Sequence, residues 1–437
     1  MNILVSAAAV LLFVVGLALS VGLHELGHLI PGKLFNVKVT QYFIGFGRTL
    51  WSRRRGETEY GVKAIPLGGY VKLVGMLPPA ADEEPGKVRA SRTGMFQQLV
   101  SDARSAEYED VGPHDHGRLF YQLPWWKRVI VWGAGVTINV VLAFLLFAAV
   151  FMGYGALTPT TTVSSVSECV QVVSAQQKPG PCTASDPVTP AREAGLRPGD
   201  RILRFNGQEI GAYAQLQRLI RANGDDAFTL TVERAGRELT LHAHSVVNQL
   251  PALGDARGSD KTVEAGFLGI TPTLEVQRKS AGYVVTTMVD GTKEVLETIG
   301  KLPVKVYHVG RAALGLEERA DDSPMSVVGA GRIVGEVGAS DQGTLASKFF
   351  FVLSVLAGLN LFLGLINLVP LPPFDGAGVA TSLYDALRRG IARVLRRPAP
   401  GPVDSAKLLP LSYAMAVVIM VVSVVLVVAD VVAPVTL

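Results

Sequence analysis

Two histidines and one glutamate lie together at the end of the first apolar stretch of the chain. His24, Glu25 and His28 form the pattern H-E-x-x-H within residues 21–31, which read VGLHELGHLIP. On a helix, residues four positions apart share one face and are about 6 Å apart along the axis. Both imidazoles can therefore bind the same Zn²⁺, and Glu25 is placed to take a proton from an attacking water. The pattern predicts a zinc hydrolase site.

Two ordinary explanations compete with this interpretation. The pattern can arise by chance on a soluble helix, or the apolar run can be a signal peptide. However, residues 3–23 carry no charge, and polar groups at the end of such a run are costly in a membrane without a partner or a function. The chain opens Met-Asn-Ile with no basic residue, and no A-x-A-like cleavage site follows, which disfavours a signal peptide.

The helix that carries this pattern is one of several long apolar segments. The chain has 437 residues, enough for two or three domains, and 49% of them are hydrophobic. Four stretches are long enough to cross a bilayer, which takes about 20 residues: about 3–30, 129–157, 349–369 and 408–429. Trp125 and Trp126 are expected to anchor the second span at the membrane interface. The net charge of +4 gives no reason to expect nucleic acid as a partner.

Lysine and arginine are concentrated in two of the connecting segments, 31–128 and 379–407. The positive-inside rule places both on the cytoplasmic side, and four spans are consistent with that. Both chain ends and the region 158–347 are then extracytoplasmic, in a multi-pass protein of the cell membrane. The H-E-x-x-H pattern falls at the cytoplasmic end of the first span.

The first cytoplasmic segment contains two stretches typical of strands. Residues 41–50 and 59–76 are rich in Gly, aromatic and β-branched residues, with a turn at 53–56. They predict a hairpin-like sheet, either an ordinary cytoplasmic hairpin or one that dips toward the site. Residues 77–123 are polar and poor in pattern, which predicts a flexible insertion. His114-Asp115-His116 within it is expected to be a solvated loop, with a second metal site as the less favoured alternative.

Asp375 is the best candidate for a third metal ligand. Residues 367–378 read NLVPLPPFDGAG and lie at the end of the third span, on the same membrane side as His28. Catalytic zinc sites usually have three protein ligands and one open position. The alternative is that Asp375 caps the N-terminus of a helix after a proline turn.

Taken together, these motifs resemble the site-2 protease family of intramembrane zinc metalloproteases. The resemblance covers H-E-x-x-H, the GFG at 45–47, AGLRPGD at 194–200, SPMSVVG at 323–329 and N-x-x-P-x-P-x-x-D-G at 367–376. It implies Zn²⁺ held by His24, His28 and Asp375, with Glu25 as general base and Asn367 holding the substrate. Three departures are Phe374, where relatives more often have Leu, Asn360, where many bacterial relatives have their second Asn nearer to the position of Asn367, and a single recognisable PDZ-like module.

The resemblance predicts an α-helical membrane protein with four transmembrane helices, a membrane-associated β-hairpin region and an extracytoplasmic α+β PDZ-like domain. The expected segments are 1–30 (first helix), 31–124 (β region and insertion), 125–157 (second helix), 158–290 (PDZ-like domain), 291–347 (amphipathic connector), 348–378 (third helix), 379–407 (basic segment) and 408–430 (fourth helix).

The expected function is regulated intramembrane proteolysis, in which a bilayer-embedded zinc endopeptidase cuts a transmembrane segment. The resemblance implies single-span substrates such as anti-sigma factors or remnant signal peptides. An exposed strand edge within 41–76 would extend the substrate helix by β-augmentation. Two alternatives stay open: a membrane-anchored zincin that acts on soluble or misfolded proteins, using Glu107 or Glu109 as ligand, and a non-proteolytic PDZ adaptor.

Two further expectations concern the outer region. Residues 266–270 resemble the carboxylate-binding loop of a PDZ domain, which would bind a peptide terminus in a groove beside the helix at 212–221. Cys169 and Cys182 are the two cysteines of the chain. They are expected to form a disulfide, because the region is assigned to an oxidising compartment and Pro179-Gly180-Pro181 between them favours a turn. Two free thiols are the alternative.

Overall fold

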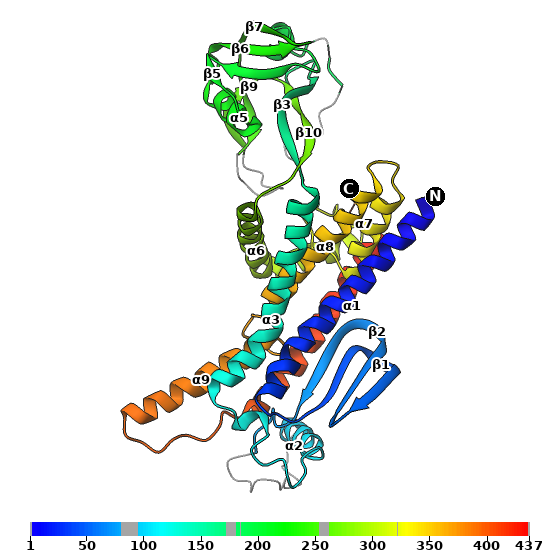
Figure 1. The fold of residues 1–437 in the computed structure, drawn as a ribbon, viewed down its shortest axis with the longest axis vertical. Helices are drawn as coiled ribbons and strands as arrows, with labels where there is room; N and C mark the ends of the chain where they lie inside the picture. Colours follow the sequence, from blue (N-terminus) through cyan, green and yellow to red (C-terminus); the bar gives the residue numbers. More distant parts are fainter. Residues whose placement is uncertain are drawn as a thin grey trace. The chain divides into compact units, whose positions relative to one another are not determined.

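The computed structural model describes residues 2–79, 95–171, 181–183, 185–252, 262–320 and 322–435. The chain divides into two compact units (Figure 1). Unit 1 comprises Met1–Val150 and Ala281–Leu437, and unit 2 comprises Phe151–Ser280. Each unit is described by itself below.

Long apolar helices form the framework of unit 1. Within the described residues, four stretches are long and apolar enough to cross a membrane, as predicted: Asn2–Leu34, Trp125–Tyr154, Leu345–Ile366 and Ser405–Val432. They correspond to α1 (Asn2–Leu34), α3 (Trp125–Ala148) with the π-helical continuation Ala149–Tyr154, α8 (Leu345–Ile366), and α10 (Leu409–Val432) preceded by the 3₁₀ turn Ser405–Leu408. The first helix extends four residues beyond the expected end at residue 30.

Small residues let α1 and α3 approach each other closely. A Cβ added at Gly27 would lie 2.8 Å from the carbonyl oxygen of Ala134 and 2.8 Å from the Cα of Gly135. Such small-residue contacts are how helices pack in membranes, where van der Waals contact replaces the hydrophobic effect. Nearer the N-terminus of α1, buried Phe13 packs with Val334 and Leu356. The close approach matters because both histidines of the pattern lie on the same part of α1.

A small antiparallel sheet lies beside α1, consistent with the predicted strand region. It consists of two long strands, each of which contributes two paired segments. β1 covers Val39–Arg55 and β2 covers Thr58–Leu73. Tyr42 on β1 stands opposite both Val71 and Tyr60 on β2, so the first part of β1 lies between two segments of β2. Within the described part of the chain, the register leaves the outer edge of the segment that contains Val71 without a strand partner.

The insertion 77–123 is more ordered than the sequence suggested. Residues 80–94 lie outside the described residues, but Met95–Tyr108 forms helix α2, and a 3₁₀ turn covers Phe120–Gln122. The expected solvated loop is also wrong at Asp115, whose buried carboxylate accepts a hydrogen bond from Lys38 Nζ at 2.7 Å. Lys38 and Asp115 are 77 positions apart in the sequence, and no periodic pattern predicts their contact.

Of three further helices, two differ from the predicted boundaries. α6 (Ala281–Ala313) begins inside the segment that was assigned to the PDZ-like domain up to residue 290. α7 (Val327–Ala339) lies in the expected connector. α9 (Asp375–Val394) begins where the third span was expected to continue to residue 378, after α8 has already ended at Ile366. The prolines between Leu368 and Phe374 explain this break, because a proline cannot continue the backbone hydrogen bonding of a helix.

Unit 2 is built on an antiparallel sheet. Its path is β10-β3-β4-β6-β7, with β5 beside β4, and a separate pair is formed by β8 and β9. The elements are β3 (Ala156–Val166), α4 (Pro190–Glu193), β4 (Arg201–Phe205), β5 (Gln208–Glu209), α5 (Tyr213–Ala222), β6 (Ala227–Arg234), β7 (Arg237–His244), β8 (Val246–Pro251), β9 (Thr262–Phe267) and β10 (Ile270–Gln277).

The core of unit 2 is apolar and includes Leu216 of α5 and Leu230 of β6, both fully buried. In the structure the sulfurs of Cys169 and Cys182 are bonded, with their Cα atoms 5.9 Å apart. A Cβ at Gly266 would lie 2.2 Å from the carbonyl oxygen of Ile220. The end of α5 therefore packs directly on β9 at this point, which narrows the groove expected between them.

Candidate active site

The two histidines of α1 meet at their Nε2 atoms, which are 3.3 Å apart. Both side chains are buried. The Nδ1 atom of His28 lies 2.8 Å from the backbone carbonyl oxygen of Val131 on α3. A carbonyl oxygen only accepts hydrogen bonds, so Nδ1 carries the proton and Nε2 is left with its lone pair. The carbonyl of α3 thus orients this imidazole as a metal ligand.

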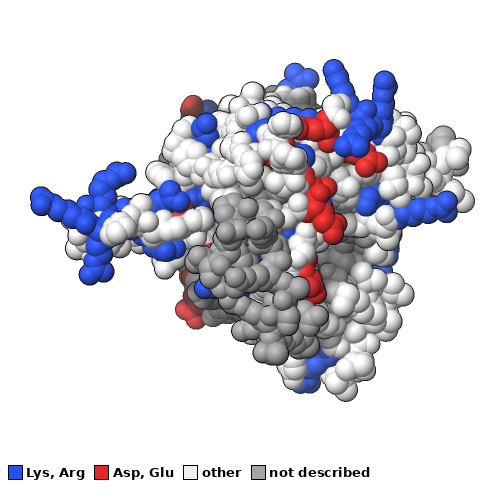
Figure 2. Space-filling view, turned by 90° about the horizontal axis from the view of Figure 1, so that it is seen from below, with Lys and Arg blue, Asp and Glu red and all other residues white. Residues whose placement is uncertain are grey.

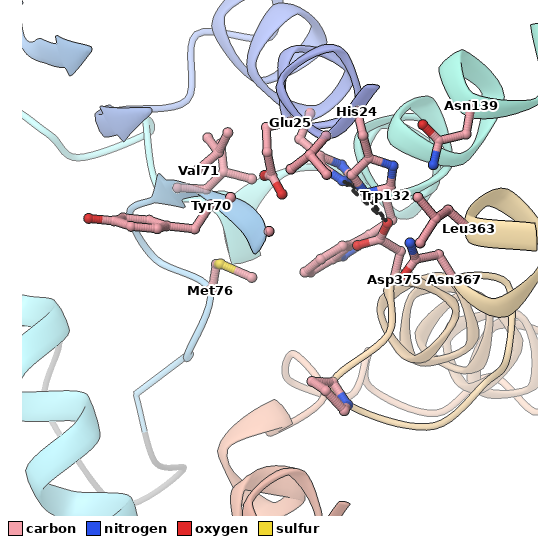
Figure 3. Close-up of a pocket in the computed structure, with 16 residues that line it drawn as sticks. His24, Glu25, Tyr70, Val71, Met76, Trp132, Asn139, Leu363, Asn367 and Asp375 are labelled. Atoms are coloured by element: carbon pink, nitrogen blue, oxygen red, sulfur yellow. Dashed lines mark hydrogen bonds and ion pairs between the residues drawn. The ribbon is translucent and has the colours of Figure 1, made fainter. Parts of the chain in front are cut away.

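Asp375 brings a third ligand atom to the same point from the other end of the chain. Its Oδ2 lies 3.2 Å from Nε2 of His24 and 3.3 Å from Nε2 of His28 (Figure 3). The backbone N–H of Gly376 donates to the carbonyl of Asn367 at 2.7 Å, which closes the loop before α9. A side chain at Gly376 would collide with the carbonyl of Leu368 at 2.3 Å. The glycine of the D-G pair therefore lets this loop fold tightly enough to aim Asp375 at the histidines.

The three ligand atoms fit a zinc ion. At Zn–N and Zn–O distances of about 2.0–2.2 Å and tetrahedral angles, neighbouring ligand atoms are roughly 3.3–3.5 Å apart. The three distances in the structure are 3.2, 3.3 and 3.3 Å. Oδ2 of Asp375 is also buried without a hydrogen-bond partner. Among the described residues, His24, His28 and Asp375 are the one group of three or more such side chains that could hold a metal ion.

Glu25 lies beside this cluster, at the edge of the small sheet. It lines a cavity of about 320 Å³ together with His24, Asp375 and the β2 residues Tyr70 and Val71 (Figure 3). A Cβ at Gly69 would lie 2.9 Å from Cγ of Glu25, so the strand passes directly over the glutamate. The free edge of β2, the carboxylate and the three ligand atoms therefore face one cavity.

Two asparagine side chains line the opposite part of the cavity. Asn367 ends α8 as its C-terminal cap, and Asn139 projects from α3 (Figure 3). Asn139 is 1% exposed, and its Oδ1 atom has no hydrogen-bond partner. An unpaired buried amide oxygen is costly. In this position it is available to a backbone N–H of a bound peptide.

The turn after β2 is held from outside the cavity by α2. The carboxylate of Glu107 accepts hydrogen bonds from the backbone N–H groups of Met76, which lines the cavity, and of Leu77. Ser405 donates to the carbonyl of Met76 at 2.8 Å. Burial raises the pKa of Glu107 to about 7, although the backbone hydrogen bonds act in the opposite direction. Glu107 therefore holds this turn, and neither Glu107 nor Glu109 belongs to the cluster of possible metal ligands among the described residues.

The structure brings together every residue that the sequence placed in the catalytic site: His24, Glu25, His28, Asn367 and Asp375 all line the cavity. Sequence reasoning missed the contributions of α3. The carbonyl of Val131 leaves no signal in a sequence. The small residues around Gly135 and the polar Asn139, four positions apart within an apolar helix, did carry a signal, since polar residues inside a span usually have a function.

Comparisons with known proteins agree with this geometry. The profile described as Peptidase family M50 matches residues 12–396. The chain is 31% identical over 438 residues to the zinc metalloprotease Rip1 of Mycobacterium tuberculosis, with 98% of each chain covered. It is 28% identical over 392 residues to the metalloprotease MmpA of Caulobacter vibrioides, with 87% of this chain and 86% of that protein covered.

An H-E-x-x-H helix joined to a distant aspartate among apolar helices defines a membrane-embedded metalloprotease. The chain belongs to peptidase family M50, the site-2 protease family, which confirms the resemblance. It is a zinc metalloprotease of that family. The non-proteolytic adaptor that the sequence left open is therefore wrong as a description of the chain.

Proposed function

We propose that the chain is an intramembrane endopeptidase that cuts a transmembrane segment of another protein. The observation that carries the proposal is the position of the site. His24 and His28 lie on α1, a helix long and apolar enough to cross a membrane. The cavity that contains them also receives side chains from α3 and from the end of α8, two further candidate spans. A site built between such helices favours a substrate that is itself in the bilayer.

In this proposal His24, His28 and Asp375 would hold Zn²⁺, which would supply Lewis-acid activation of the scissile carbonyl and of a water molecule. Glu25 takes the proton of the attacking water and delivers it to the nitrogen of the leaving amine. The carbonyl of Val131 orients His28 so that its Nε2 atom points at the cluster. The Glu25 carboxylate is free for proton transfer because it is not one of the three clustered ligands.

The substrate must be extended before it can be cut, since a helix engages its carbonyls in internal hydrogen bonds. The free edge of β2 at Gly69–Val71 supports a role as the template, because an unpaired edge offers main-chain hydrogen bonds to an added strand. Asn139 and Asn367 would hold the opposite side of the extended peptide. By the same family resemblance, single-span anti-sigma factors and remnant signal peptides are the proposed substrates.

The charge distribution supports a topology in which the site faces the cytoplasmic leaflet. Both chain ends and unit 2 would then be extracytoplasmic, and the PDZ-like function proposed for unit 2 is binding of a trimmed substrate terminus. Fusions of a reporter that is active on only one side of the membrane, placed after Ala433 and within 398–403, test this arrangement. Equal signals from the two fusions would contradict it.

Two variants of the purified protein test the roles in the site. Glu25→Gln is expected to keep its zinc and to lose turnover by about 10²–10⁴-fold on a helical membrane substrate. Asp375→Ala is expected to lose zinc and activity together, because one of three ligands is removed. Zinc content is measured alongside cleavage. Wild-type zinc content and activity in Asp375→Ala would overturn the ligand assignment, whereas cleavage of soluble proteins alone would overturn the intramembrane substrate.

A further inference from the structure

The second half of α9 carries an exposed apolar stripe. Leu383, Leu387, Ile391 and Val394 recur at helical spacing and fall within roughly 80° of arc on one face. Their exposed fractions are 48, 59, 51 and 82%. Scattered exposed apolar residues are ordinary, but a continuous stripe on a projecting helix marks an interaction surface. We call residues 383–397 the α9 arm.

The arm is also strongly basic. It carries Arg388, Arg389, Arg393, Arg396 and Arg397, and the segment between Asp385 and Asp404 contains no acidic residue. Figure 2 shows these basic side chains gathered where the helix projects at the left edge of the view. The guanidinium of Arg388 lies 5.8 Å from the ring centroid of Tyr384, at one border of the stripe. Helical spacing places Arg393 beyond the other border.

A buried ion pair fixes the depth of the arm relative to the membrane. The carboxylate of Asp385 accepts from Arg128 of α3, and the two side chains are 0 and 8% exposed. Arg128 lies in the first turn of α3, two positions after Trp126. Trp125 and Trp126 are 42 and 45% exposed. Exposed tryptophans at the start of a span mark the membrane–water interface. The start of the arm is therefore at the level of the lipid headgroups.

We propose that the α9 arm is a binding site for anionic phospholipids and lies in the interface plane. The apolar stripe would enter the acyl boundary, while the arginines extend along it and keep their guanidinium groups among the phosphates. The bilayer is already present at this depth, so the stripe is covered without any additional protein. Charge complementarity selects the anionic lipids, since each basic residue near such a surface strengthens attraction by about fivefold.

The consequence for the protein is that lipid composition acts on the helix that begins with Asp375. The arm and the clustered carboxylate are two ends of one continuous helix. This inference does not require the proposed substrate to be correct, because lipid binding is measured without cleavage.

The test uses the full-length protein in nanodiscs of phosphatidylcholine alone or with phosphatidylglycerol. An environment-sensitive fluorophore is attached at Ile391→Cys, and Ala392→Cys on the opposite side of the helix serves as the matched position. Fluorescence at 391 is expected to show an apolar environment and quenching by spin-labelled lipid, more strongly with phosphatidylglycerol. Position 392 is expected to remain water-exposed in both.

Charge dependence is tested in the Ile391→Cys protein by Arg388, Arg393 and Arg397→Gln together. This change is expected to weaken the docking equilibrium in phosphatidylglycerol discs by about a hundredfold, and replacement of the same three residues by Lys is expected to restore it. The control removes equal charge from exposed positions of unit 2, through Arg192, Arg201 and Arg237→Gln.

Three outcomes would overturn the proposal. A water-exposed label at 391 in both discs would mean that the stripe is not covered by lipid. Equal docking with and without phosphatidylglycerol would exclude anionic selectivity. Docking that appears only after a soluble protein is added would assign the stripe to a protein partner instead.

Discussion

Replacement of Gly135 by alanine tests how tightly α3 encloses the histidine cluster. A Cβ at Gly135 would lie 2.5 Å from Nε2 of His28, 2.7 Å from its Cε1 and 2.9 Å from Cε1 of His24. The contacted atoms belong to buried rings, one of which is fixed by the carbonyl of Val131. Neither ring can move away freely.

The size of the effect follows from these distances. Ordinary contact between a carbon and its neighbour is roughly 3.5 Å, so His28 or the backbone of α3 must move by about 1 Å. Metal ligands tolerate deviations of about 0.2 Å. We therefore expect Gly135→Ala to weaken zinc binding by at least the 10–100-fold typical of disturbed supporting contacts.

The assay is zinc retention by the purified protein against graded concentrations of a chelator, followed by cleavage of a membrane substrate. Gly133→Ala is the matched control, because it lies on the same helix and its Cβ would meet nothing within 4 Å. Both changes raise helix propensity by about the same 1 kcal/mol. Wild-type zinc affinity and cleavage in Gly135→Ala would refute the inference that α3 packs too closely on His24 and His28 to admit a side chain at position 135.

Three further outcomes are expected. Burial raises the pKa of Glu107 in the folded protein, so the folded state loses stability as the pH rises from the ordinary carboxyl pKa of 4.5 to the folded-state pKa of about 7. Glu107→Gln should remove this loss from a plot of melting temperature against pH, and an unchanged plot would contradict the assignment. Peptide mass spectrometry without reduction should find Cys169 linked to Cys182, whereas two alkylated thiols in protein from native membranes would reject the bridge. Arg319→Ala should cost about 3–5 kcal/mol by leaving the Asp430 carboxylate buried and unpaired; in detergent melts, replacing both residues with apolar ones should restore much of the loss, and equal loss in both variants would exclude this cause.

The site residues that could be predicted from the sequence are those that belong to short, recognisable motifs. His24, Glu25 and His28 share one helical turn, and Asp375 stands beside a glycine at the end of an apolar run. The chemistry of each residue type is readable from such short windows. The supporting contacts are not, because the hydrogen bond from His28 to the carbonyl of Val131 joins residues 103 positions apart and uses a backbone group that every residue possesses.

The four long helices were also predictable, since an uncharged run of this length has few other stable forms. The boundary errors came from elements of mixed composition. The sequence does not reveal α9 because its first half, DGAGVATSLY, is rich in small residues and follows a proline-rich loop, and because its arginines by themselves indicate only topology. α2 was missed because its order depends on tertiary contacts such as that of Glu107 with the turn at Met76. The PDZ-like identity of unit 2 and its peptide partner remain predictions.

The separation of the ligands along the chain has a consequence for biosynthesis. His24 and His28 leave the ribosome roughly 350 residues before Asp375, which at 5–20 residues per second is about 20–70 s. During that interval the nascent chain holds only two of the three clustered ligand atoms. Under the proposed function, a protease that would cut membrane segments therefore lacks its complete ligand set while other newly inserted helices lie near it at the translocation machinery. The three ligand atoms come together only when the third span has been delivered and Asp375, at the start of α9, has reached the histidines of α1.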